Sequence, residues 1–144
     1  MARVDFYILQ DGAPTERLRF ACRLAEKAYR AGHRVFIQTA NREQAALLDE
    51  LLWTFRAGSF VPHTLSGATP GGDAPPVVIG EQHCPGDATD LLVNLTNAVP
   101  EMFRGYQRIA EIIDQHEDTK KSGRDRFRFY KDNGYEPETH AIPS

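Results

Sequence analysis

The sequence has little of what metal sites, disulfide frameworks and nucleic-acid coats are made from. Only two of its 144 residues are cysteine, Cys22 and Cys84, and neither has a Cys-x-x-Cys neighbour, so no zinc site or disulfide framework is indicated. The formal net charge of −3 lacks the basic excess of proteins that coat nucleic acid through phosphate contacts. No apolar run approaches the ~20 residues of a membrane span, and the first residues lack a signal-peptide core. We therefore expect a cytoplasmic protein with no membrane contact.

Motifs for nucleotide binding and catalysis are also missing. The turn at residues 10–14 has one glycine, without the Gly-x-Gly-x-x-Gly or Gly-x-x-x-x-Gly-Lys spacing that lets backbone amides surround a phosphate. The five histidines are dispersed with no i, i+4 pair, and no Gly-x-Ser-x-Gly elbow is present. We therefore expect no catalytic residue, no metal and no cofactor.

Predicted strands and helices alternate along the chain, which is typical of an α/β domain. Strands are predicted at 4–9, 33–39, 76–80 and 91–95, with a brief extended piece at 59–63; helices are predicted at 16–31, 41–53, from Pro100 through 106–113, and at about 118–133. We predict one domain, 1–144, with a three-layer Rossmann-like α/β fold: a mixed, mostly parallel sheet with helices on both faces. The last ~10 residues are predicted to be a flexible tail.

Aromatic residues cluster after the second predicted helix. Trp53, Phe55 and Phe60 fall within eight residues of one another. Core packing explains such a cluster, and so does a protein-binding patch, because Trp and Phe are favoured interface anchors.

The last predicted helix carries a basic face. Lys120, Arg124, Phe127 and Lys131 follow i, i+4, i+7 and i+11 spacing, with Arg128 at the flank of this face. A solvated face is the simpler interpretation. Cations around an aromatic side chain would also suit a peptide that ends in an aromatic residue and a free carboxylate.

Short segments along nearly the whole chain resemble one family, the chi subunit of bacterial DNA polymerase III holoenzyme. These segments are Phe6-Tyr7-Ile8-Leu9, Gly32-His33-Arg34-Val35, Leu48-Asp49-Glu50-Leu51-Leu52-Trp53, Ser59-Phe60-Val61-Pro62-His63, Gly72-Asp73-Ala74-Pro75-Pro76-Val77, and the stretch from Arg124 through Tyr130 to Gly134-Tyr135.

The resemblance implies a non-catalytic subunit of the clamp-loader assembly that links it to single-stranded-DNA-binding protein, contacts DNA only indirectly, and is associated with the nucleoid through the replisome. It implies that the C-terminal tail of that protein binds beside the last helix. The positions implied for this contact are Lys120, Arg124, Phe127, Arg128, Tyr130 and Tyr135. It also implies a contact with the psi subunit of the clamp loader, where the host has one, through Trp53, Phe60 and His63.

Two other functions remain open from the sequence. An α/β nucleotide-binding enzyme would use the crevice at the carboxyl ends of the parallel strands. A direct single-stranded nucleic-acid binder would use the basic last helix, and its affinity would fall steeply with salt.

Overall fold

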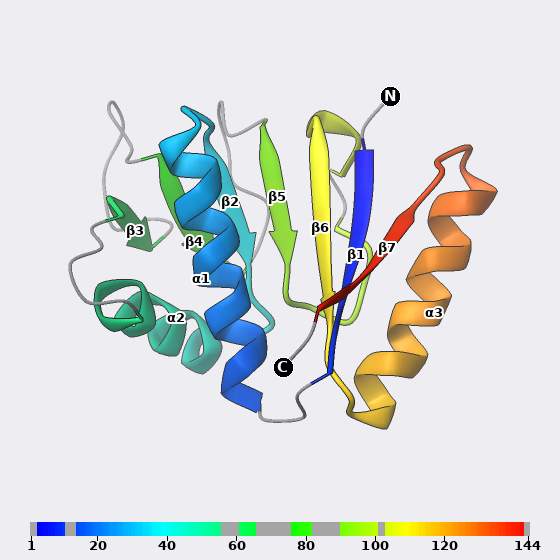
Figure 1. Ribbon diagram of the computed structural model, residues 1–144, viewed down its shortest axis with the longest axis horizontal. Helices are drawn as coiled ribbons and strands as arrows, with labels where there is room; N and C mark the ends of the chain where they lie inside the picture. The colour runs from blue at the N-terminus through cyan, green and yellow to red at the C-terminus, as the bar shows by residue number, and fades with distance from the viewer. Residues whose placement is uncertain are drawn as a thin grey trace.

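The computed structural model describes residues 3–10, 14–55, 61–65, 76–81, 90–100 and 103–142. Within them, strands and helices alternate along most of the chain (Figure 1). The elements are β1 (Arg3–Leu9), α1 (Pro14–Arg30), β2 (Val35–Gln38), α2 (Arg42–Thr54), β3 (His63–Leu65), β4 (Val77–Gly80), β5 (Leu91–Asn94), the short 3₁₀ helix η1 (Phe103–Gly105), β6 (Arg108–Ile113), α3 (Glu117–Asp132) and β7 (Glu138–Ile142).

The strands form one sheet in the order β3-β4-β2-β5-β6-β1-β7. All six pairings between neighbouring strands are parallel. The Rossmann-like α/β class is thus confirmed, but the expected mixed sheet is an entirely parallel one across the described strands. A hairpin joins only antiparallel strands, so parallel neighbours such as these are linked by longer crossover connections.

Helices lie on both faces of the sheet, as predicted. α1 and α2 cover one face and pack with the strands into a first core cluster that includes Tyr7, Leu18 and Leu48. α3 packs on the other face, where Phe6, Phe103 and Tyr130 belong to a second cluster. Figure 1 shows α1 in front of β2, α2 below β3 and β4, and α3 at the β1–β7 end of the sheet.

Helix ends follow the local signals in the sequence. Asn41 caps α2, since its side chain accepts a hydrogen bond from the backbone N–H of Gln44 at 2.8 Å. Gly32 and Gly134 follow α1 and α3 with φ of 86° and 90°, a left-handed conformation that favours glycine. Among the described residues, no helix combines the length and apolar character needed to cross a bilayer.

Two segments differ from their predictions. Residues 108–113, predicted to be helical, form β6 in the interior of the sheet, and residues 138–142, predicted to be part of a flexible tail, form the edge strand β7. β6 is buried on both faces and therefore shows no period-2 alternation that would distinguish it from a helix. β7 is held instead by its backbone ladder with β1, from Asp5↔Glu138 to Leu9↔Ile142.

Candidate functional site

A groove lies between α3 and the β1–β7 end of the sheet. Its volume is about 210 Å³. This α3 groove is lined by residues of β1, β6, α3 and β7, namely Phe6, Ile8, Ile113, Lys120, Gly123, Arg124, Phe127 and Thr139. The first, sixth and last strands of the chain therefore all contribute to one site.

The floor of the groove is apolar. Phe6 of β1 and Phe127 of α3 meet edge to face, with ring centroids 5.2 Å apart. Gly123 allows α3 to approach the sheet closely, because a Cβ added there would lie 2.7 Å from Cδ1 of Ile113. A larger side chain at position 123 would have to displace Ile113 from the groove.

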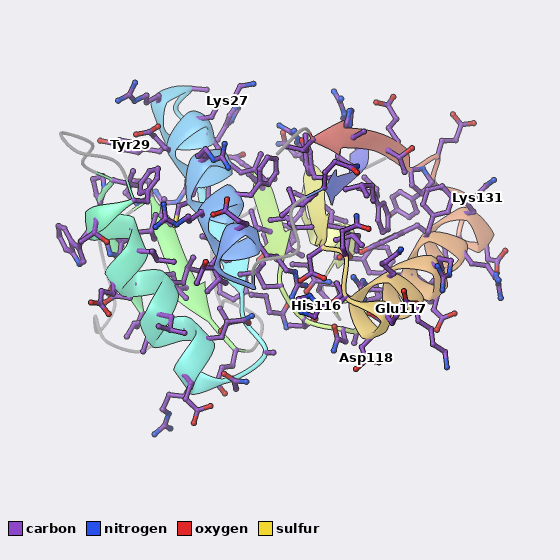
Figure 2. The ribbon with its side chains drawn as sticks, turned by 60° about the horizontal axis from the view of Figure 1, so that its bottom comes forward. Lys27, Tyr29, His116, Glu117, Asp118 and Lys131 are labelled. Atoms are coloured by element: carbon purple, nitrogen blue, oxygen red, sulfur yellow. The ribbon has the colours of Figure 1, made fainter. Side chains whose placement is uncertain are left out.

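The rim of the groove is cationic. Lys120 and Arg124, one helical turn apart, both line it, and neither has an ion-pair partner among the described residues. The ammonium of Lys131 lies 5.9 Å from the centre of the Phe127 ring. Of the acids of the same helix, Glu117 and Asp118 lie in its first turn, while Lys131 lies near its end, and both placements suit the helix dipole (Figure 2). Asp125 and Asp132 are exposed on the same helix, and within the described part of the chain neither forms an ion pair with Lys120 or Arg124.

A buried polar network holds α3 from behind the groove. The Glu111 carboxylate of β6 is completely buried and accepts hydrogen bonds from Arg126 Nε (3.1 Å), the Tyr130 hydroxyl (2.9 Å) and Asn94 Nδ2 (3.0 and 3.1 Å). Burial raises the pKa of Glu111, against the opposing effects of Arg126, Asn94 and Tyr130. Burial beside Glu111 also raises the pKa of Tyr130, which therefore remains a hydrogen-bond donor at neutral pH. The network ties α3 to the centre of the sheet at two points of the helix.

The structure brings together only part of the predicted tail site. Lys120, Arg124 and Phe127 line the α3 groove, as expected. Arg128 is exposed on α3 outside the groove lining. Tyr130 and Tyr135, expected in the pocket wall, are 0% and 7% exposed and belong to the core cluster behind it.

One cation of α3 is almost completely buried. Arg126 is only 3% exposed, because its guanidinium pairs with Glu111 inside the protein. The sequence pattern gave no sign of this pair, since Glu111 lies in the stretch predicted to be helical.

Four further groove residues come from strands and were missed. Phe6 and Ile8 occupy alternate positions of β1 and so share one face, Thr139 is on β7, and Ile113 ends β6. The two-residue period of β1 was enough to group Phe6 with Ile8. It does not show which face of the strand α3 covers.

A second candidate surface lies at the end of α2. Trp53 is 55% exposed and its ring centroid is 4.7 Å from that of His63. His63 Nε2 lies 3.2 Å from a carboxylate oxygen of Asp49, which holds the imidazole against α2. Leu47 of the same helix is 53% exposed. Phe60, the third residue predicted for this contact, lies outside the described residues.

Comparisons with known proteins agree on one family. The family model described as "DNA polymerase III chi subunit, HolC" matches residues 1–138. The chain is 41% identical to the DNA polymerase III subunit chi of Pseudomonas aeruginosa, over 99% of both chains, and 29% identical to that of Escherichia coli, over 94% of this chain and 95% of the other.

A likeness to a solved structure agrees with the fold. The crystal structure of T4 UvsW superposes with a TM-score of 0.68 over 99% of this chain and 42% of that chain. At 10% identity this likeness shows the fold alone. It is the match of the family model over almost the entire length that assigns the chain to the DNA polymerase III chi subunit family.

Proposed function

We propose that this accessory subunit of DNA polymerase III is an adaptor that binds the C-terminal tail of single-stranded-DNA-binding protein in the α3 groove and so links it to the clamp loader. The observation that carries the proposal is the combination of an apolar floor, Phe6 and Phe127, with two rim cations that have no ion-pair partner among the described residues, Lys120 and Arg124. An acidic peptide with a terminal aromatic residue complements both parts.

The size of the groove supports a side chain rather than a cofactor as its occupant. At about 210 Å³ it is smaller than the ~300–1,000 Å³ of most small-molecule sites. Burying one aromatic side chain contributes ~1.5–3 kcal/mol. The rest of the affinity comes from the charges, which are screened by salt with a Debye length of ~10 Å at 0.1 M. We therefore expect a micromolar complex, ~8 kcal/mol, that weakens as salt is added.

The direct test is fluorescence anisotropy of a labelled peptide that copies the last ~10 residues of the host's single-stranded-DNA-binding protein. The Arg124→Glu variant and a C-terminally amidated peptide should both lose saturable binding, because each removes one half of the charge contact. Lys121→Glu is the matched control, since Lys121 is exposed on the same helix but does not line the groove. Equal loss in Lys121→Glu would mean that the helix attracts the peptide only by its overall charge, and the groove assignment would be wrong.

The same titration separates the adaptor from its rivals. A direct nucleic-acid binder would bind a labelled oligonucleotide without the partner protein and lose that binding in Arg124→Glu. A nucleotide enzyme would carry a nucleotide in the crevice at the carboxyl ends of the strands.

For the second surface we propose a contact with another subunit, psi in hosts that have it, through Trp53; the His63 side chain is 0% exposed and packs behind the Trp53 ring. The supporting observation is the exposure of Trp53 and Leu47 on one helix, since exposed large apolar side chains are favoured at interfaces. Trp53→Ala should abolish co-purification with that subunit and leave tail-peptide binding unchanged. Loss of both interactions would instead show that the substitution unfolds the protein.

A further inference from the structure

A larger cavity lies on the other face of the sheet from the α3 groove. Its volume is about 590 Å³, within the ~300–1,000 Å³ of small-molecule sites. It runs between α1 and the β1–β7 end of the sheet, which no described helix covers on this face (Figure 1). We call it the α1 cleft. Its lining comprises Arg3, Tyr7, Phe20, Arg23, Leu24, Lys27, Ala28, Ala31, His33, Asp90, Leu91, Gln107, Arg108 and Ile142.

One part of this cleft is apolar and aromatic. Phe20 and Leu24 come from α1, and Ile142 comes from β7. The Tyr7 ring of β1 is tilted against Phe20 with centroids 5.2 Å apart. Both rings are 8% exposed, and the His140 ring stacks on Tyr7 with centroids 5.1 Å apart, so the partly buried Leu24 and Ile142 complete the apolar wall toward the cleft.

Cations reach the cleft from two sides. Arg23 and Lys27 are one turn apart on α1, near whose carboxyl end Lys27 lies (Figure 2). Arg3 and Arg108 are register neighbours on β1 and β6 across from that helix. An acidic protein thus has four permanent positive charges in one cavity.

The carboxylates nearby neutralise only the pair on the sheet. Asp5 accepts hydrogen bonds from Arg3 Nε (3.1 Å) and Arg108 Nε (3.0 Å), and the exposed Glu138 lies 3.4 Å from Arg3. Neither Asp5 nor Glu138 pairs with the helix cations.

Asp90, the acid that lines the cleft, is engaged elsewhere. It accepts a hydrogen bond from the Arg34 amide at 2.7 Å and lies 4.0 Å from His33 Nδ1. Over the described part of the chain, Arg23 and Lys27 have no carboxylate partner; Arg23 contacts only the Phe20 ring, 5.5 Å away. Two positive charges therefore remain beside the apolar wall.

We propose that the α1 cleft binds a nucleotide, with its phosphates between the α1 cations and Arg108 and its base on the apolar wall that includes Leu24 and Ile142. Phosphates supply the two negative charges that Arg23 and Lys27 lack. A base has both a flat face and polar edges, which suits an apolar wall beside the exposed Gln107 amide; the Tyr7 hydroxyl already accepts a hydrogen bond from Arg108.

The α1 cleft is distinct from the α3 groove and from the crevice at the carboxyl ends of the strands. It opens at the amino ends of the strands, where Arg3, Leu91 and Arg108 are the first residues of β1, β5 and β6. Nucleotide-binding enzymes with this kind of sheet use the carboxyl ends. The proposal is also independent of tail binding, which uses the opposite face.

The test is isothermal titration calorimetry of the whole protein with ADP, adenosine and pyrophosphate in parallel. ADP should bind saturably, and at least fivefold more tightly than adenosine or pyrophosphate, because only ADP uses both the wall and the cations. The double variant Arg23→Glu/Lys27→Glu should weaken ADP binding at least tenfold. Arg19→Glu is the matched control: Arg19 is exposed on the same helix and does not line the cleft.

A labelled ten-nucleotide dT strand, titrated with the same proteins, identifies the source of the nucleotide. If ADP displaces the strand and the double variant fails to bind it, the ligand is a nucleotide within single-stranded DNA; if the strand does not bind, it is a free nucleotide. The proposal is overturned if ADP fails to bind at millimolar concentration to a protein that still binds the tail peptide, or if the double variant binds ADP as the parent does. Loss of tail-peptide rather than ADP binding in that variant would make the cleft a peptide site instead.

Discussion

The buried pair of Glu111 and Arg126 provides the sharpest test of how α3 is held in place. The two side chains are 0% and 3% exposed and joined by a 3.1 Å hydrogen bond. Arg126→Met keeps much of the side-chain volume but leaves the carboxylate buried without its cation. Breaking a buried pair in this way costs ~3–5 kcal/mol. Because Asn94 and Tyr130 still donate to Glu111, we expect the lower end of that range, ~3 kcal/mol.

Urea unfolding followed by circular dichroism measures this effect. With a slope of ~2 kcal/mol/M, the midpoint of Arg126→Met should fall by ~1.5 M. Adding Glu111→Gln should recover at least ~1 kcal/mol, because a neutral amide costs less to bury than an unpaired carboxylate. The second substitution therefore separates the charge from the packing.

Arg124→Met is the matched control, being an exposed arginine on the same helix, and its midpoint should change little. The reasoning is refuted if Arg126→Met lowers the free energy of unfolding by less than ~1 kcal/mol. It is also refuted if the double variant is no more stable than Arg126→Met, since burial of an unpaired charge would then not be the cause.

Three further predictions concern other parts of the molecule. Gly123→Val should weaken tail-peptide binding about tenfold in anisotropy, ~1.4 kcal/mol, because the new side chain must displace Ile113 from the groove floor. Asp5→Asn should lower the melting temperature at pH 7 and have less effect below pH ~4. Burial alone would raise the pKa of Asp5, but hydrogen bonds from its basic neighbours outweigh burial and hold that pKa below its usual value. The contribution of the Asp5 carboxylate to stability is therefore present above the pKa of the unfolded state and is lost in acid. Burial raises the pKa of Cys22 to about 12, so its thiol should resist iodoacetamide at pH 8 in the native protein, as measured by mass spectrometry.

Each of these has its own control. Lys121→Val, a neighbouring exposed substitution, should bind the peptide normally, and normal binding by Gly123→Val would contradict the close approach of α3 to the sheet. Glu138→Gln removes an exposed carboxylate beside Asp5 and should be nearly neutral; an equal loss of stability in both variants at pH 7 would remove the special role of Asp5. Urea should expose Cys22 to the reagent, whereas rapid native labelling would contradict its burial.

Local patterns predicted most of the fold correctly. Helices with a clear apolar face and an end signal, such as Asn41 before α2 and Gly134 after α3, have nearly the predicted bounds. β6 was mistaken for a helix because a strand buried on both faces loses its alternation. β7 was missed because its side chains are mostly exposed and its stability comes from pairing with a strand about 130 residues earlier in the chain.

The groove was predictable only where it belongs to one helix. Spacing along α3 correctly grouped Lys120, Arg124 and Phe127. It could not show that Tyr130, three residues after Phe127, turns toward the sheet, or that Arg126 has a buried acid to pair with. The orientation of Tyr130 and the partner of Arg126 both depend on how α3 is placed over the sheet. The spacing of residues along one helix carries no information about that placement.

The position of β1 has a consequence for synthesis of the protein on the ribosome. The first strand emerges early, yet its neighbours in the sheet are the sixth and the last strands, so it has no partner until almost the whole chain has been made. The α3 groove needs all three strands and the helix between the last two. A nascent chain therefore cannot display the groove, and the proposed tail binding requires a subunit that has been released from the ribosome.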